Sequence, residues 1–307
     1  MFDTVKLVLP VADPKRVVDC LTDVEERYGS KTGKRSFMGK VGTLRAHLSA
    51  SDEACSHRLV VQGSLPTYHG HLTLDAAETS RCIERLGNAL SLDLRPAKVL
   101  RLDVFADFVL SRPVADYLLH LLDGPRYQRV SYDRLGKRYE LKWRHLVFYD
   151  KVAERKKKRG LIPEAWVGKN VLRYEMQLRK QPNRQLVLNH ISFADLADES
   201  FRAHAADRWR TEYLRIGKRR DYVGGVSAET FKVDLQCAGL RVVGLDAVET
   251  ILTSAFDQGT IPEWKYYRLR RWARDTYNLD ARTALASPVE ELDQAVDGQR
   301  NRIHVTC

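Results

Sequence analysis

The sequence predicts an α+β fold, in which an antiparallel sheet is flanked by helices and followed by a helical C-terminal region. Two observations carry this prediction. In the first two-thirds of the 307-residue chain, short segments alternate between apolar and polar residues and are separated by turn residues, which is typical of strands joined in hairpins. In the last third, apolar residues recur at helical spacing. We therefore expect a sheet-containing domain over 1–198 and a helical region over 199–307.

The first hundred residues predict three strands and two helices. Pro10 ends the first strand, and Asp13 followed by Pro14 is a helix start signal. A second helix is expected after Asp75. The expected strands are 3–9, 41–49 and 57–62, and the expected helices are 14–28 and 79–90; 29–42 is expected to be a basic loop or hairpin.

The remaining residues predict four strands followed by further helices. Asp123, Gly124 and Pro125 form a strong stop signal after the first of these helices. The expected strands are 99–108, 127–132, 137–149 and 171–178. The expected helices are 113–122, 199–219, 228–238, 245–256, 263–278 and 289–296.

Composition points to a globular protein with an anionic partner. Hydrophobic residues make up 44% and charged residues 30% of the chain, and the net charge is +11. Such an excess of positive charge favours binding to a polyanion. The five cysteines are scattered without a CxxC pair, which excludes a disulfide framework and a zinc knuckle. No apolar run approaches 18 residues, so we expect a cytoplasmic protein that does not enter a membrane.

The segment 142–151 is a predicted strand that carries a tyrosine and a lysine on one face. Alternation places His145, Val147, Tyr149 and Lys151 together, and two residues of strand separate Tyr149 from Lys151 by about 7 Å. A nearby ammonium favours the ionised form of a phenol, which would prepare the tyrosine to attack phosphorus. Taken alone, the same pattern also fits a half-buried amphipathic strand.

Two further predicted strands share the order Leu-Arg-apolar-carboxylate. In 99–108, Arg101 and Asp103 lie on one face, and in 171–178, Arg173 and Glu175 do the same. A carboxylate inside an apolar strand must be paired or bound to a metal, because burying it alone is costly. One such strand would be explained by an Arg–carboxylate pair that braces the sheet. Two with the same spacing, beside a Tyr-x-Lys strand, indicate a functional site.

These segments together resemble the II/X family of phage and plasmid replication proteins, which is related to the tyrosine nickases of rolling-circle replication. The ordered set of short motifs covers about the first two-thirds of the chain. The matching segments are 1–7 (MFDTVKL), 63–66 (GSLP), Gly70-His71, 100–103 (LRLD), 148–151 (FYDK) and 172–175 (LRYE).

The resemblance implies a metal-dependent enzyme that nicks and rejoins DNA. Tyr149 would be the nucleophile that forms a 5′-phosphotyrosyl link and frees a 3′-hydroxyl, and Lys151 would stabilise the phenolate or the phosphate. Arg101 and Arg173 would orient carboxylates or contact the DNA backbone. Mg²⁺ or Mn²⁺ would be held by Asp103 and Glu175, with His71 as the candidate third ligand and His69 as a weaker one. The implied partners are a single-stranded or hairpin replication origin and the host replication machinery.

Two basic stretches are candidate DNA contacts. The run 155–159, which consists of Arg155, Lys156, Lys157, Lys158 and Arg159, follows the predicted nucleophile and would suit the DNA backbone. A solvated loop is the alternative for any such run. In 264–274, aromatic and basic residues interleave, which suits single-stranded DNA as well as a helix with a buried aromatic stripe.

Two other classes of function remain open on the sequence. The chain could be a non-catalytic origin-binding regulator on the same scaffold, or a metal-dependent hydrolase of another phosphodiester in which Tyr149 is structural. No GxxxxGK[ST] loop and no GxSxG motif occurs, so ATP-driven ligation and Ser/His/Asp hydrolysis have no support.

Overall fold

The computed structural model describes residues 1–28, 35–50, 57–124, 126–133, 136–218, 239–240, 243–282 and 288–305. The chain forms two compact units. The sheet unit comprises Met1–Val109, Asp123–Ile216 and Ala295–Cys307, and the helical unit comprises Leu110–Leu122 and Gly217–Gln294.

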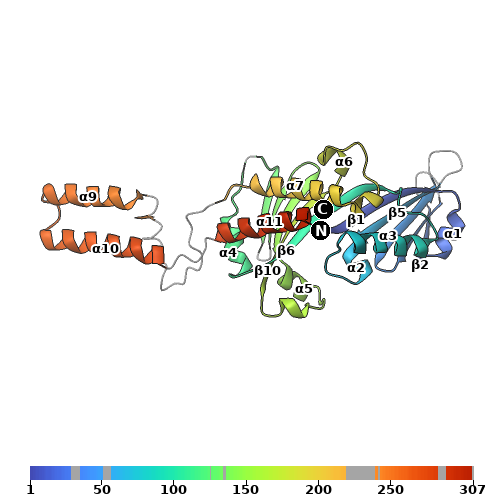
Figure 1. The fold of residues 1–307 in the computed structure, drawn as a ribbon, viewed down its shortest axis with the longest axis horizontal. Coiled ribbons are helices and arrows are strands. Elements are labelled where there is room, and N and C mark those ends of the chain that lie inside the picture. The colour runs from blue at the N-terminus through green and yellow to red at the C-terminus, as the bar shows by residue number, and fades with distance from the viewer. Residues whose placement is uncertain are drawn as a thin grey trace. The chain divides into compact units, whose positions relative to one another are not determined.

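The sheet unit is built on one antiparallel sheet of ten strands, which confirms the predicted α+β class (Figure 1). The strand order is β2-β3-β4-β5-β1-β6-β10-β9-β8-β7, so the three segments that carry the predicted site residues are adjacent in the order β6, β10, β9. The strands are β1 (Phe2–Val11), β2 (Thr22–Tyr28), β3 (Arg35–Val41), β4 (Leu44–Ala50), β5 (His57–Ser64), β6 (Lys98–Leu110), β7 (Arg129–Asp133), β8 (Gly136–Glu140), β9 (Arg144–Asp150) and β10 (Asn170–Leu178).

Helices of the sheet unit begin with side-chain caps that the sequence contains. Asp13 caps the first of them, and Asp75 and Glu78 form a reciprocal capping box at the start of the third. These helices are α1 (Pro14–Asp19), α2 (Leu65–His69), α3 (Ala76–Leu90), α5 (Lys151–Lys157), α6 (Pro182–Gln185) and α7 (Glu199–Leu214), with short 3₁₀ turns at Glu164–Trp166 and Ala194–Ala197.

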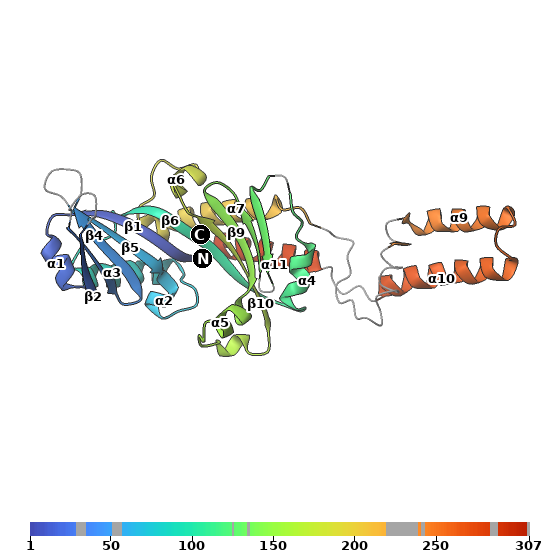
Figure 2. The same ribbon diagram turned by 180° about the vertical axis from the view of Figure 1, so that it is seen from behind.

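One face of β6, β10 and β9 is covered by α7, as the two opposite views show together (Figures 1 and 2). Trp209 of α7 is 2% exposed and its ring stacks on Tyr174 of β10 at 4.8 Å between centroids. Tyr174 in turn stacks on Phe148 of β9 at 4.4 Å. The even-numbered residues of β9 and β10 therefore form the core, and the odd-numbered residues lie on the other face.

We expect Trp209→Ala to destabilise the sheet unit by about 3–5 kcal/mol, because the change removes a buried ring and leaves a cavity between α7 and the sheet. Urea unfolding followed by circular dichroism measures this loss. Trp209→Phe, which keeps a ring in place, serves as the control and should lose much less. A loss below 1 kcal/mol for the alanine variant would contradict this account of the core.

The structure corrects several predicted boundaries. The helix predicted over 14–28 ends at Asp19, and Thr22–Tyr28 forms β2 instead, because this segment pairs with β3 along the edge of the sheet. The strand predicted over 137–149 is broken after Glu140 into β8 and β9. Leu65–His69, for which the sequence predicted no helix, forms α2. The helix predicted over 228–238 lies outside the described residues.

The start of the predicted C-terminal region belongs to the sheet unit. The sequence placed the domain boundary at 198, whereas α7 (Glu199–Leu214) packs on the sheet through its aromatic residues. The last part of α11 (Pro288–Val305) also joins this unit, since Arg210 pairs with Asp297 and Arg300 with Asp207.

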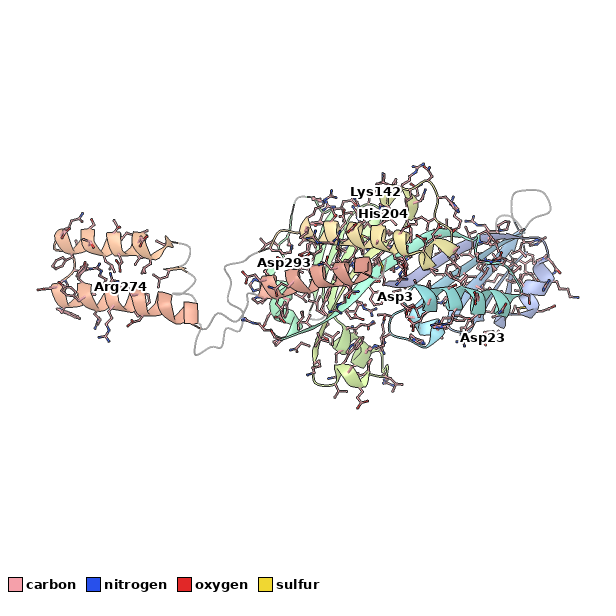
Figure 3. The ribbon with its side chains drawn as sticks, viewed as in Figure 1. Asp3, Asp23, Lys142, His204, Arg274 and Asp293 are labelled. Carbon is pink, nitrogen blue, oxygen red and sulfur yellow. The ribbon has the colours of Figure 1, made fainter. Side chains whose placement is uncertain are left out.

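The helical unit contains α4 (Val114–His120), α9 (Leu245–Asp257), α10 (Glu263–Arg282) and the first part of α11. Glu249 of α9 pairs with Arg270 and Arg274 of α10, and Arg274 is labelled in Figure 3. Phe256 of α9 stacks on Tyr266 of α10 at 4.8 Å.

The aromatic stripe expected over 264–274 is buried only in part on α10. Tyr266 is 7% exposed and packs against α9, whereas the rings of Trp264, Tyr267 and Trp272 are exposed. The guanidinium of Arg268 lies 4.8 Å from the Trp264 ring centroid. In the part of the chain that the structure describes, no helix is both long enough and apolar enough to cross a membrane.

Candidate functional site

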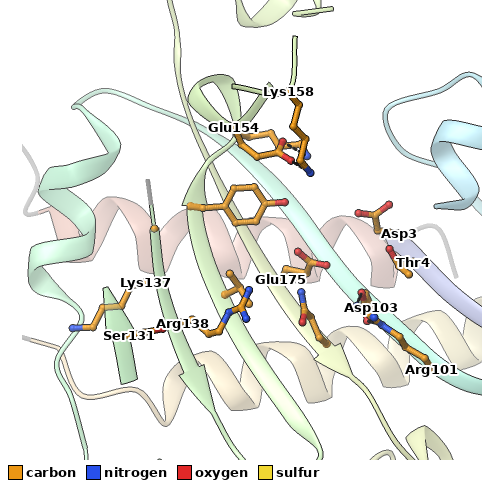
Figure 4. A pocket seen from close by; sticks show the side chains of 15 residues that line it. Asp3, Thr4, Arg101, Asp103, Ser131, Lys137, Arg138, Glu154, Lys158 and Glu175 are labelled. Atoms are coloured by element: carbon orange, nitrogen blue, oxygen red, sulfur yellow. Dashed lines mark hydrogen bonds and ion pairs between the residues drawn. The ribbon is translucent and has the colours of Figure 1, made fainter. Parts of the chain in front are cut away.

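The odd-numbered face of β6, β10 and β9 carries an open cavity of about 610 Å³ (Figure 4). Its lining residues come from β1, β6, β7, β8, β9 and β10 and from α5 with its C-terminal end, and they include both acidic and basic side chains. The lining residues with titratable side chains are Asp3, Arg101, Asp103, Lys137, Arg138, Tyr149, Lys151, Glu154, Lys158 and Glu175.

Asp103 is held by a two-pronged pair with its strand neighbour Arg101. Nε of Arg101 donates to Oδ1 at 3.0 Å and Nη2 donates to Oδ2 at 2.6 Å. The carboxylate is 1% exposed, and burial raises its pKa even though the Arg101 hydrogen bonds lower it. This is the bracing Arg–carboxylate pair that the sequence offered as the structural explanation for one strand.

Arg173 does not form the corresponding pair with Glu175. Its Nε and Nη2 donate to the two oxygens of Asp107 on β6, each at 2.6 Å, and its Nη1 donates to Oδ2 of Asp3 on β1 at 3.2 Å. The guanidinium lies 3.9 Å from the centroid of the Phe105 ring. Arg173 therefore ties β10 to β6 and β1, and it leaves Glu175 without a guanidinium partner among the described residues.

Glu175 is the carboxylate with the most strongly perturbed acidity in the cavity. It is 6% exposed, and its pKa is raised to about 8, first by burial and then by the negative charges of Asp103 and Asp3. Three carboxylates thus lie near one another with too little positive charge to neutralise them. A site of this kind gains free energy when it takes up protons or a cation.

Tyr149 lies on the same face as these carboxylates. It is paired with Arg173 on β10 and with Gly136 on β8 in the register of the sheet. A Cβ atom at position 136 would lie 2.7 Å from the Cβ of Tyr149 and 2.5 Å from the carbonyl oxygen of Phe148, so only glycine fits opposite the tyrosine. The structure therefore brings together Tyr149, Asp103 and Glu175, as the sequence predicted.

The acidity predicted for Tyr149 is wrong. The sequence led us to expect a lowered pKa beside Lys151, but the pKa of Tyr149 is raised, mainly by burial and then by the charge of Glu175. Arg173 opposes this effect without overcoming it. The Lys151 ammonium lies 5.4 Å from the centroid of the tyrosine ring, where it contacts the ring face.

Lys151 reaches the cavity from the first turn of α5, not from the strand as predicted. Its Nζ donates to Oε2 of Glu154 at 2.9 Å, and Lys158 pairs with the other oxygen of the same carboxylate. Burial lowers the pKa of Lys151, as does the charge of Arg173. Glu154 thus holds two ammonium groups at the rim of the cavity.

The basic run 155–159 divides between structural and exposed positions. Arg155 stacks over the Trp166 ring at 5.4 Å and donates to the carbonyl oxygen of Leu161. Lys158 lines the cavity, and Lys156, Lys157 and Arg159 are exposed beside it. The stretch forms the last three residues of α5 and the two residues that follow it.

His71 is not brought to the cavity. It follows α2, where its Nδ1 lies 3.2 Å from Oε1 of Glu78 and its ring stacks on His69 at 4.9 Å. Neither histidine is among the residues that line the cavity. Across the described residues, no group of three or more His, Cys, Asp or Glu side chains has the arrangement needed to hold a metal ion by itself.

Asp3 is the acidic site residue to which the sequence gave no role. It receives hydrogen bonds from Ser64 and Arg173 and lines the cavity together with Asp103 and Glu175. The available signal was the one used for the other two strands, namely a carboxylate inside an apolar strand. Tyr149 is the only tyrosine among the described residues that line the cavity.

Comparison with known proteins gives no assignment for this arrangement. No protein-family model matches the chain, and no curated protein matches it.

Proposed function

We propose that the chain is a site-specific DNA nicking and joining enzyme that uses Tyr149 as its nucleophile. The observation that carries this proposal is that Tyr149, Asp103 and Glu175 line one open cavity whose rim is basic. A phenol can attack a phosphodiester, buried carboxylates can hold a divalent cation, and ammonium and guanidinium groups can bind the DNA backbone.

The chain's own groups would act as follows. The phenolic oxygen of Tyr149 forms a bond to phosphorus, the bond from phosphorus to the 3′ oxygen breaks, and that oxygen takes up a proton while the phenol loses one. Lys151 and Lys158 lie where they would offset charge on the phosphate oxygens. Arg101 positions Asp103 through a two-pronged pair, and Arg173 positions Asp3 through a hydrogen bond from Nη1. The phosphotyrosyl link keeps the energy of the phosphodiester, so rejoining requires no ATP.

The carboxylates fit a hard divalent cation such as Mg²⁺ or Mn²⁺. Glu175 has no guanidinium partner among the described residues, and its pKa is raised first by burial and then by the negative charges of Asp103 and Asp3. Mg²⁺ is commonly held by one or two carboxylates together with substrate phosphates and water, so a full set of protein ligands is not required. Such a cation would polarise the scissile phosphate. His71 plays no part in this proposal.

The biological role that follows from the family resemblance is initiation of rolling-circle replication. The substrate would be a single-stranded or hairpin origin, the freed 3′-hydroxyl would serve the host replication machinery, and the reaction would take place in the bacterial cytoplasm. Exposed rings and cations on α10 are suited to single-stranded DNA.

Two observations favour the second candidate, a non-catalytic origin-binding regulator. Both oxygens of Asp103 are already occupied by Arg101, and the pKa of Tyr149 is raised, neither of which activates a nucleophile. This candidate binds DNA without cleaving it and needs no cation.

Trapping a covalent intermediate distinguishes the two candidates. The full chain is incubated in Mn²⁺ with DNA from the genome that encodes it, both as single-stranded fragments and as supercoiled circles. The protein is then denatured and digested. We expect a DNA-linked peptide that contains Tyr149, identified by mass spectrometry, and none in EDTA. DNA binding without any covalent product in Mn²⁺ would support the regulator instead.

A further inference from the structure

A fully buried carboxylate on α7 is surrounded by four arginines. Glu212 has no exposed surface, and its partners come from the segment before β7, from β9 and from α7 with its C-terminal end. We call this group the arginine cluster; its members are Arg126, Arg144, Arg208 and Arg215.

All four guanidinium groups contact the same carboxylate. Oε1 of Glu212 lies 3.2 Å from Arg144, 3.2 Å from Arg208 and 2.8 Å from Arg215. Oε2 accepts a hydrogen bond from Arg126. The cluster therefore holds four positive charges within the contact distance of one negative charge.

One arginine would neutralise Glu212, so three positive charges are in excess. A carboxylate offers about four acceptor sites, whereas each guanidinium carries about five N–H donors. Most of the donors therefore have no place on Glu212, and Nε of Arg144 and Nε of Arg208 are buried without a hydrogen-bond partner among the residues that the structure describes. Burial and the charges of Arg208 and Arg126 lower the pKa of Arg144, although Glu212 opposes them. Bracing of the sheet does not account for this excess of charge.

Three members of the cluster remain within reach of solvent. The side chains of Arg126, Arg208 and Arg215 are 30%, 27% and 48% exposed. Arg144 lies at the start of β9, on the same face as Phe148, so the cluster and Tyr149 are on opposite faces of one strand. Five residues of strand separate positions 144 and 149, which is about 17 Å.

We propose that the arginine cluster binds a backbone phosphate of DNA, at a place distinct from the cavity of Tyr149. Guanidinium groups are suited to phosphate because their N–H donors match its oxygens in pairs. The proposal rests on DNA being the substrate, as proposed above, and adds a contact on the opposite face of the sheet. Glu212 positions the arginines and fixes the orientation of their guanidinium groups.

The test compares DNA binding by wild type and by Arg208→Gln/Arg215→Gln. Fluorescence anisotropy with a labelled single-stranded oligonucleotide is measured in EDTA at several salt concentrations, so that no cleavage takes place. Each lost phosphate contact reduces the slope of log affinity against log salt by about 0.7 for single strands. We expect the double variant to bind at least about tenfold more weakly, with a slope smaller by about 0.7, because one phosphate contact is lost.

The matched control is Arg16→Gln/Arg210→Gln, which removes the same total charge outside the cluster. Arg210 lies on α7 and pairs with Asp297. The control should keep an affinity close to that of wild type. If the double variant does not fold, as judged by circular dichroism, Arg215→Gln alone is used, because its side chain is the most exposed of the cluster; a slope smaller by about 0.7 is then expected.

Two results would overturn the proposal. One is a folded cluster variant that binds DNA as tightly as wild type, or no more weakly than the control. The other is a pair of measurements in which inorganic phosphate stabilises the wild type against heat but not the cluster variant, while the two proteins bind DNA with the same affinity. A small phosphate anion would then be the ligand. Because no cleavage takes place in this assay, neither result bears on the nicking reaction of Tyr149, which is tested separately by the covalent adduct.

Discussion

Tyr149→Phe is expected to abolish nicking and the covalent DNA adduct while DNA binding is retained. The change removes the oxygen that would form the bond to phosphorus and keeps the ring that packs beside Gly136 and Lys151. Loss of a nucleophile typically costs a rate factor on the order of 10³ or more. The measurement is conversion of supercoiled to open-circular DNA in Mn²⁺, together with detection of protein-linked DNA.

Tyr174→Phe is the matched control for this experiment. Tyr174 lies on β10, with its ring on the α7 face and its hydroxyl donating to the backbone carbonyl of Trp209. Its replacement removes one hydrogen bond in the core, at a cost of about 1 kcal/mol, and leaves the cavity intact. Nicking by Tyr149→Phe at the rate of the wild type would exclude Tyr149 as the nucleophile and favour a hydrolase in which this residue is structural.

Glu175→Gln is expected to stop cleavage and, in EDTA at pH 8.5, to raise the melting temperature. The folded-state pKa of Glu175 is raised from 4.5 to about 8, so the folded protein binds this proton more tightly than the unfolded chain does. Stability contributed by the protonated acid is present below about pH 4.5 and is lost as pH rises to about 8. Glutamine cannot ionise, so the variant avoids this loss.

The size of the effect follows from the same shift. A unit of pKa corresponds to about 1.4 kcal/mol, and each kcal/mol moves the melting temperature by about 2–4 °C in a domain of this size. We expect an increase of about 5 °C or more at pH 8.5, and no difference near pH 4.5. Adding Mn²⁺ should then stabilise the wild type and not the variant. Scanning calorimetry in EDTA and in Mn²⁺ measures both effects.

Glu154→Gln provides a control of opposite sign. Burial raises the pKa of Glu154, but the hydrogen bonds from Lys158 and Lys151 outweigh burial and lower it. A lowered pKa contributes stability above the unfolded value, so this variant should melt below wild type at pH 8.5. If Glu175→Gln also melts below wild type in EDTA, the ionised Glu175 carboxylate stabilises the fold without a cation. That result would contradict the proposed cation site.

Residues close in sequence were predicted well because strand alternation determines which side chains share a face. The positions of Arg101, Asp103, Glu175 and Tyr149 on one face follow from a period of two, and the order β6, β10, β9 then makes them neighbours. Even here, the sequence could not give the acidity of Tyr149, because that depends on how deeply the folded sheet buries the phenol.

The partners of Arg173 could not be predicted for a different reason. Asp107 and Asp3 are far from Arg173 in sequence and meet it only through the pairing of β1, β6 and β10. The sequence suggested a local pair between Arg173 and Glu175. Because Arg173 pairs with Asp107 and Asp3 instead, Glu175 has no guanidinium partner among the described residues. The same limit applies to the arginine cluster, whose members come together only when α7 docks on the sheet. At 22–28, four charged residues among seven concealed an edge strand that pairs with β3.

If the chain is the proposed nickase, a cavity with a single phenol among its described lining residues would limit how DNA ends can be handled. One protein molecule could remain attached to one 5′ terminus and no more, so a second cut must wait until the first terminus has been handed back to a 3′-hydroxyl. Release of a finished circle would then be a strictly alternating process, or would need another copy of the protein. The ratio of attached protein to DNA termini in a completed reaction would distinguish these two schemes.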